Sequence, residues 1–106
     1  MTPEKVVIGT TEDFEVGAAR KVEVGRHKVV VVRIGDDFYA LGDRCSHAEV
    51  SLSEGEVYPE DLEIECWKHG STFSLVTGRP ATLPATRPVP VYEVAVVDGK
   101  VWLELP

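Results

Sequence analysis

The sequence predicts an all-β protein with a small antiparallel sandwich or barrel as its base and one inserted subdomain. Short β-branched runs alternate with Gly and Asp turns, and no useful stretch has the 3.6-residue period of a helix. A chain of 106 residues is long enough for one domain with a modest core. Apolar runs become sparse between residues 43 and 84. We therefore expect a base formed by residues 1–42 and 85–106, with residues 43–84 inserted between its two parts.

The first half of the chain carries four expected strands, at residues 5–9, 18–24, 27–34 and 38–41. The third of these contains four consecutive valines, which is typical of a strand buried at the centre of a structure. The segment from Thr10 to Phe14 resembles a capped helical turn that is too short to form a real helix.

The second half is expected to form shorter strands. Glu54-Gly55 indicates a turn, and short strands are expected at residues 62–66 and 73–76. A longer strand over residues 91–97, the Asp98-Gly99 turn and a strand over residues 100–105 form the clearest hairpin of the sequence.

Composition excludes several classes of function. The net charge of −7 argues against nucleic acid binding, which needs a basic face, and is equally compatible with docking onto basic partners and with plain solubility. No run approaches the roughly 18 apolar residues of a membrane span. The N-terminus has no signal-peptide pattern, and two cysteines without one indicate a reducing cytoplasm.

Two short loops carry the chemistry. Cys45 and His47 lie one residue apart, Cys66 and His69 lie two apart, and eighteen residues separate the pairs. Two thiolates and two imidazoles suit either a structural zinc or a [2Fe-2S] cluster in which two histidines hold one iron. Zinc modules usually pair like ligands on one arm, whereas both arms are mixed here. The mixed arms favour two irons, and zinc stays the alternative.

This pattern resembles the Rieske motif, Cys-x-His followed by Cys-x-x-His-Gly. The resemblance continues through Phe73, Thr77-Gly78 and Pro84-Ala85, where Rieske ferredoxins carry similar residues beside the cluster. It implies one [2Fe-2S] cluster, with the cysteines on one iron and the histidines on the outer iron. The cofactor-binding and metal-ligating residues implied are Cys45, His47, Cys66 and His69.

Neighbouring positions refine the expectation. Val50 and Lys68 stand where Rieske proteins of respiratory complexes carry disulfide cysteines, which points to the ferredoxin branch. Ser71 matches a hydroxyl that bonds a cluster sulfide in the high-potential branch. Phe73 replaces the tyrosine of that branch, so a potential toward the low end of roughly −150 to +300 mV is expected. Two further residues are expected near the cluster: Trp67, which either packs against the loops or offers a docking contact, and Pro84.

The resemblance implies a soluble, monomeric, cytoplasmic one-electron carrier and no catalytic residue. Its partners would be an NAD(P)H-dependent flavoprotein reductase and a terminal oxygenase of the aromatic-ring dioxygenase type, reached by transient docking without nucleic acid or membrane. Similar domains occur as small subunits of nitrite reductases and beside iron–sulfur assembly proteins, which keeps those pathways open. A structural zinc-binding interaction module is the alternative of another class.

Overall fold

The structure, a computed structural model, describes residues 4–45, 50–68, 70–81 and 87–105. These residues form ten strands and two short 3-10 helices, with no α-helix among them. None of the described helices is long and apolar enough to cross a membrane. The expected all-β class is therefore confirmed.

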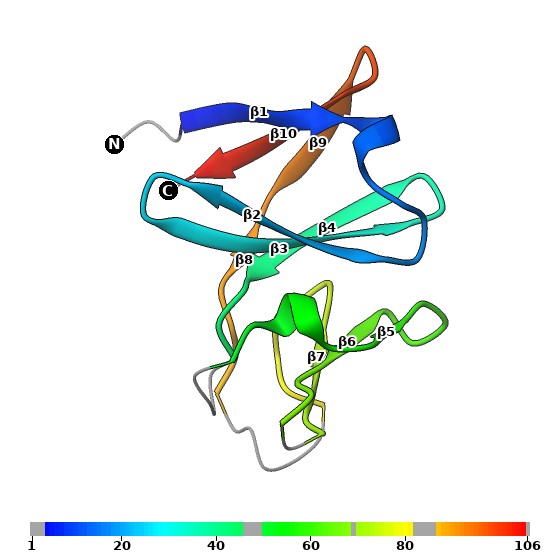
Figure 1. The fold of residues 1–106 in the computed structure, drawn as a ribbon, viewed down its shortest axis with the longest axis vertical. Coiled ribbons are helices and arrows are strands. Elements are labelled where there is room, and N and C mark those ends of the chain that lie inside the picture. The colour runs from blue at the N-terminus through cyan, green and yellow to red at the C-terminus, as the bar shows by residue number, and fades with distance from the viewer. Residues whose placement is uncertain (1–3, 46–49, 69, 82–86, 106) are drawn as a thin grey trace.

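The strands form three antiparallel sheets (Figure 1). The first sheet has the order β1-β10-β9, made of Glu4–Thr10, Lys100–Leu105 and Val94–Val97. The second has the order β2-β3-β4-β8, made of Ala19–Val24, His27–Ile34, Asp37–Gly42 and Val91–Tyr92. The third has the order β5-β6-β7, made of Val57–Tyr58, Glu63–Glu65 and Thr72–Ser74. The 3-10 helices are η1, Thr11–Asp13, and η2, Leu52–Glu54.

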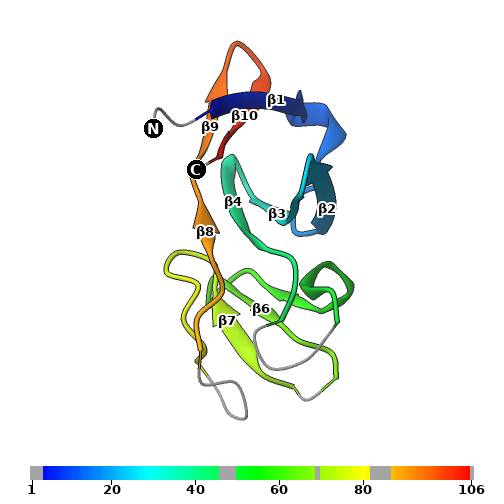
Figure 2. The ribbon, with the colours of Figure 1, turned by 90° about the vertical axis from the view of Figure 1, so that its left-hand side faces the viewer.

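The first and second sheets build the base, and the third lies at the far end of the molecule from the first sheet (Figures 1 and 2). One hydrophobic core fills the base, with residues from both base sheets: Phe14, Val29, Val31, Ala40, Val101, Leu103 and Leu105. The faces of the two sheets therefore bury each other, as expected for a small sandwich or barrel.

Strand β3 is a central strand of its sheet, as its four valines predict, and it is buried on both faces. Val29 and Val31 point into the core of the base, whereas Val30 and Val32 belong to a second core. Because side chains alternate along a strand, a run of valines serves both cores at once. Strand β3 thus lies between the two cores and contributes side chains to each of them.

The second core joins the base to the third sheet. It contains Val30, Val32, Leu41, Cys45, Leu52, Ile64, Cys66, Phe73, Leu75 and Val89. Both cysteines of the sequence are therefore part of the packing that holds the third sheet in place.

The C-terminal hairpin forms as predicted. Val97 pairs with Lys100, and the two residues between them, Asp98 and Gly99, have φ values of 52° and 75°. Positive φ at both central positions is the type I′ geometry that suits the twist of paired strands.

A single strand over residues 91–97 is a wrong prediction. Val91 and Tyr92 pair with β4, whereas the chain from Val94 onward pairs with β10 in the other sheet. Glu93 lies at the switch, and its carbonyl accepts the N–H of Glu104 at 2.9 Å. The sequence of an apolar run does not reveal whether the strand that pairs with it changes along its length.

The strand expected at residues 73–76 ends early, at Ser74. The hydroxyl of Ser74 accepts the N–H groups of Val76 and Thr77, both at 3.2 Å, and its carbonyl accepts the N–H of Gly78 at 2.8 Å. When a serine side chain hydrogen-bonds to nearby backbone groups, it stabilises a turn in competition with the hydrogen bonds of a β-sheet. The two-residue strand β5 was not predicted, since it is too short to show a period.

Candidate metal centre

Two loops contribute the two thiols to the second core. Cys45 follows β4 and Cys66 follows β6 directly. Their exposed fractions are 2% and 0%, and neither forms a disulfide. Because both belong to one core cluster, the fold brings together two residues that are 21 positions apart in the sequence.

Backbone hydrogen bonds close both loops. The N–H of Cys45 donates to the carbonyl of Val50 at 3.0 Å, and the N–H of Cys66 donates to the carbonyl of Ser71 at 2.6 Å. Gly70, with a φ of 76°, donates its N–H to the carbonyl of Cys66 at 2.9 Å. A side chain at Gly70 would strain this turn, since its backbone lies in the left-handed region.

Asp43 anchors the first loop, and sequence reasoning missed it. Its side chain is 2% exposed; Oδ1 accepts the N–H of Ser53 at 2.9 Å, and Oδ2 lies 3.8 Å from the Lys21 ammonium. Its backbone donates to Lys28 and accepts from Leu52. Arg44 then bridges to Ser51, so the start and the return of the loop run side by side. The only sequence signal for this role was the position of Asp43, which directly follows a strand and lies two residues before a predicted ligand.

The second loop rests on a close backbone approach. A Cβ on Gly55 would lie 1.6 Å from the carbonyl oxygen of Glu65, the residue before Cys66. Tyr58, on β5, donates its hydroxyl to Oε2 of Glu65 at 2.9 Å and lies 3.3 Å from Oε2 of Glu56. The hydrogen bond to Glu65, together with desolvation and both carboxylates, raises the pKa of Tyr58 to about 12.

The residues expected near the cluster have contrasting exposure. Ser71 and Phe73 are fully buried, on the second loop and on β7. Trp67 is 53% exposed although it follows a fully buried cysteine, and Lys68 beside it is exposed. The described residues therefore do not enclose the Trp67 ring.

His47, His69 and Pro84 lie outside the described residues, so the full ligand set is not tested by the geometry. The described residues alone contain no group of three or more metal-ligating side chains. The two described donors do fit a sulfur-ligated iron. Thiolates are soft ligands for iron–sulfur clusters, and burying them costs least when a cationic core balances their charge.

Comparison with known proteins agrees with this chemistry. The sequence matches the Rieske [2Fe-2S] domain over residues 4–93, and the chain belongs to that family. Its cofactor is accordingly a Rieske [2Fe-2S] cluster.

Within the family the chain is of the ferredoxin type. It is 44% identical over 92 residues to Ferredoxin CarAc of Metapseudomonas resinovorans, covering 86% of this chain and 84% of that protein. It is 41% identical over 78 residues to the 3-phenylpropionate/cinnamic acid dioxygenase ferredoxin subunit of Escherichia coli (strain K12), covering 74% and 73%.

Solved structures agree. The ferredoxin of carbazole 1,9a-dioxygenase from Nocardioides aromaticivorans IC177 superposes with a TM-score of 0.91 at 39% identity, covering 100% of this chain and 99% of that one. A ferredoxin chain in a complex of reduced oxygenase and oxidized ferredoxin of carbazole 1,9a-dioxygenase superposes with a TM-score of 0.86 at 41% identity, covering 93% and 91%.

Proposed function

We propose that this ferredoxin carries single electrons from an NAD(P)H-dependent flavoprotein reductase to a terminal oxygenase of the aromatic-ring dioxygenase type. The observation that carries the proposal is the pair of buried, unbridged cysteines in the core that joins the base to the third sheet, in a chain of the Rieske ferredoxin type. Relatives at 41–44% identity are named as ferredoxins, one of them as a dioxygenase subunit, and a similar ferredoxin forms a complex with its oxygenase.

The ligands in this proposal are Cys45, His47, Cys66 and His69. When bound, the cluster supplies one-electron oxidation and reduction. The two thiolates cancel the two positive charges of the oxidised core, and neutral imidazoles add none. The added electron then meets a neutral site rather than the doubly negative site that four thiolates would make, which favours reduction.

Two buried neighbours adjust that balance. We assign to Ser71 a hydroxyl that donates to a cluster sulfide and so stabilises the added negative charge. Its complete burial supports the assignment, since it places the hydroxyl inside the loop rather than toward solvent. Phe73 is equally buried but has no hydroxyl to donate. The chain should therefore have a potential below that of Rieske proteins in which both positions donate.

Partners would dock at the ligand end of the molecule. Trp67 and Lys68 are exposed beside the second thiol, and an electron needs a short path to the surface. An exposed aromatic side chain can contribute a large share of the binding free energy of a small interface. Pro84 belongs to this end by the resemblance. A monomer with one small docking surface suits transient association with two partners in turn.

The division into a base, residues 1–42 and 85–106, and a cluster-binding subdomain, residues 43–84, belongs to the same proposal. The third sheet falls wholly within residues 43–84, which supports it. A cytoplasmic location is also part of the proposal, because cysteines that form no disulfide suit a reducing compartment.

No observation favours the other pathways. A protein described as a nitrite reductase small subunit superposes with a TM-score of 0.82 at 22% identity, which shows the fold alone. Iron–sulfur assembly has no support from the relatives reported above. Membership of the Rieske [2Fe-2S] family favours a cluster over the zinc alternative.

A single-turnover experiment tests the proposal. The protein is reduced anaerobically with dithionite, freed of excess reductant and mixed with the oxidised oxygenase component of carbazole 1,9a-dioxygenase from Nocardioides aromaticivorans IC177. We expect rapid reoxidation of the ferredoxin with equal reduction of the oxygenase. A ferredoxin that stays reduced in the presence of this oxygenase contradicts the proposal.

A further inference from the structure

The outer face of the first sheet, at the end of the molecule away from the third sheet, has an apolar centre (Figures 1 and 2). Alternate residues of β10 are buried in the core of the base, so Lys100, Trp102 and Glu104 point outward. Val7 of β1 and Ala95 of β9 pair with Trp102 from either side. These last three residues form an apolar row that crosses all three strands.

Much of this row is exposed. Val7 is 43% exposed, and Val97, which pairs with Lys100 next to the row, is 54% exposed. A hollow of about 250 Å³ adjoins the row and is lined by Lys5, Ala95, Val97 and Trp102. Exposed apolar side chains that adjoin one another mark an interaction surface, whereas scattered ones do not.

The net charge of the chain is concentrated away from this face. The segment between Cys45 and Cys66 contains seven carboxylates and neither lysine nor arginine. It alone accounts for the net charge of −7, because the rest of the chain has eleven residues of each sign. Strands β5 and β6 of the third sheet belong to this segment and lie at the other end of the molecule (Figure 1). Two copies can therefore bring their first sheets together while their acidic segments stay far apart.

The charges of the outer face are arranged symmetrically about Trp102. Lys100 and Glu104 lie two residues to either side of it on the same strand. Within the described residues neither belongs to an ion pair, and residues 1–3 and 106, which are not described, have no charged side chain. A two-fold axis beside Trp102 and perpendicular to the strands places Lys100 of one copy against Glu104 of the other, twice. A two-fold axis along the strands would oppose like charges, so the charges select the antiparallel arrangement.

A second hollow gives the lysine of the other copy a place to bind. Its volume is about 110 Å³, and the described residues that line it are Lys5, Glu93, Val94, Ala95, Trp102 and Glu104. The carbonyl of Glu93 accepts the N–H of Glu104 at 2.9 Å, so the two carboxylates start from adjacent backbone. Two carboxylates beside one ammonium attract a further cation, and the ring of Trp102 can pack against the aliphatic part of a lysine.

We propose that a second copy of this chain docks on the outer face of the first sheet, forming a two-fold dimer in which Lys100 of each copy meets Glu104 of the other. The dimer goes beyond the proposed function. The second core, which contains both thiols, and the third sheet lie away from this face, so each copy keeps its ligand end free for a redox partner.

The dimer is weak. Neighbouring strands lie about 4.8 Å apart and residues about 3.4 Å apart along them, so a three-stranded face about six residues long covers roughly 300 Å². Interfaces of this size hold transient complexes. The monomer therefore remains the species that meets redox partners in dilute solution, and the dimer forms as the protein concentration rises.

Sedimentation equilibrium of the cluster-loaded protein tests the dimer. Between about 10 μM and about 1 mM, the weight-average mass should rise from that of one chain toward that of two. The mass of one chain is 11.6 kDa. A mass that stays at that of one chain over the whole range overturns the proposal.

Charge reversal identifies the contact. Lys100→Glu or Glu104→Lys alone places like charges together at both contacts of the dimer, and each should weaken self-association about tenfold or more. An equimolar mixture of the two variants forms mixed dimers in which both contacts join opposite charges again, so its association should come within about threefold of wild type. A mixture that associates no better than either variant alone contradicts the two-fold arrangement.

Matched controls make the same charge changes elsewhere. Lys28→Glu lies on β3 and Glu60→Lys lies in the turn between β5 and β6, both at exposed positions. Neither should change self-association more than about twofold, and their mixture should show no gain. Equal effects in the controls would assign the association to net charge and overturn the proposal.

Electron transfer separates the dimer from another occupant of this face. In the single-turnover reaction at low protein concentration, Lys100→Glu and Glu104→Lys should reduce the oxygenase at the wild-type rate. A lower rate in both variants, with cluster absorption intact, would assign the face to the oxygenase and overturn the dimer. Failure of the wild-type protein to reduce the oxygenase contradicts only the proposed function.

Discussion

Ser71 and Phe73 are both fully buried beside the second ligand loop, but only Ser71 carries a hydroxyl. In the proposed site, we expect the reduction potential to depend on this contrast. A hydrogen bond to a sulfide stabilises the reduced cluster more than the oxidised one, because the reduced cluster is more negative.

Replacement of Ser71 by alanine should therefore lower the reduction potential. A hydrogen bond contributing about 0.5–1.5 kcal/mol more to the reduced state corresponds to roughly 20–60 mV for one electron. Potentiometric titration measures the change, with Ser53→Ala as the control, because Ser53 contributes its backbone N–H to Asp43. An unchanged potential would make Ser71 an ordinary loop hydroxyl.

Tyr58 should make the free energy of unfolding fall as the pH becomes alkaline. Its pKa is raised from 10.0 to about 12, first by the hydrogen bond to Glu65. The folded state thus holds its proton more tightly than the unfolded state. The stabilisation is fully present below pH 10 and is lost as the pH rises through 12.

The Tyr58→Phe variant should lack that loss. Denaturant unfolding between pH 9 and pH 12 should give a steeper fall in the free energy of unfolding for wild type than for the variant. Identical pH profiles would show that the Tyr58–Glu65 hydrogen bond does not persist in solution.

At the scale of elements, the contact between η2 and β6 positions the second ligand loop. Gly55 closes η2 and lies so near the Glu65 carbonyl that no side chain fits between them. The Gly55→Ala variant should lose free energy of unfolding toward the upper end of about 1–3 kcal/mol, and some cluster with it, because Cys66 follows Glu65 directly.

Thermal unfolding and the iron content of purified protein measure both effects. Glu54→Ala, one residue earlier and exposed, should stay within about 0.5 kcal/mol of wild type. Full iron occupancy and wild-type stability in Gly55→Ala would mean that the backbone separates here at little cost.

The sequence predicted elements well where one pattern determined one structure. Four valines in β3 indicated a central strand, and the Asp98-Gly99 turn indicated a hairpin; both are confirmed. It failed where tertiary contacts decide. The change of sheet at Glu93 leaves no mark on an apolar run, and two-residue strands such as β5 have no period to detect.

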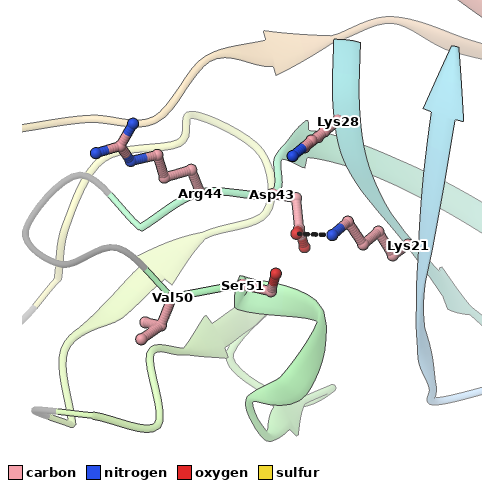
Figure 3. A pocket seen from close by; sticks show the side chains of 6 residues that line it. All are labelled: Lys21, Lys28, Asp43, Arg44, Val50 and Ser51. Carbon is pink, nitrogen blue, oxygen red and sulfur yellow. Dashed lines mark ion pairs between the residues drawn. The ribbon is translucent and has the colours of Figure 1, made fainter. Parts of the chain in front are cut away.

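The site divides in the same way. Ligand identity follows from local spacing, so all four ligands were predicted from the motif, and the burial of Cys45 and Cys66 together agrees with it. The contacts of Asp43 with Ser53 and Lys21 join segments that meet only in the fold (Figure 3), so no spacing in the sequence predicts them. The assignment of Cys45, His47, Cys66 and His69 as ligands remains a prediction from the motif.

At the scale of the whole molecule, the two cores differ in whether they contain predicted ligands. Among the described residues, the core of the base contains no predicted ligand, whereas the second core contains both thiols and joins the third sheet to β3. In the proposed site, ligation by residues from both loops would stabilise the second core, since metal binding favours only the folded arrangement.

Removal of iron should therefore loosen one end of the molecule first. Amide hydrogen exchange on chelated protein should show lost protection in β5, β6 and β7, with β1, β9 and β10 protected as before. A uniform loss of protection would mean that the two cores unfold as one unit.

The most direct test of the central claim is a potentiometric titration of anaerobically purified protein, followed by the electron paramagnetic resonance of the reduced cluster. We expect a one-electron transition with a Rieske-type signal, toward the low end of roughly −150 to +300 mV. A colourless, zinc-loaded protein without a signal at any potential would contradict both the cluster and the electron-carrier function.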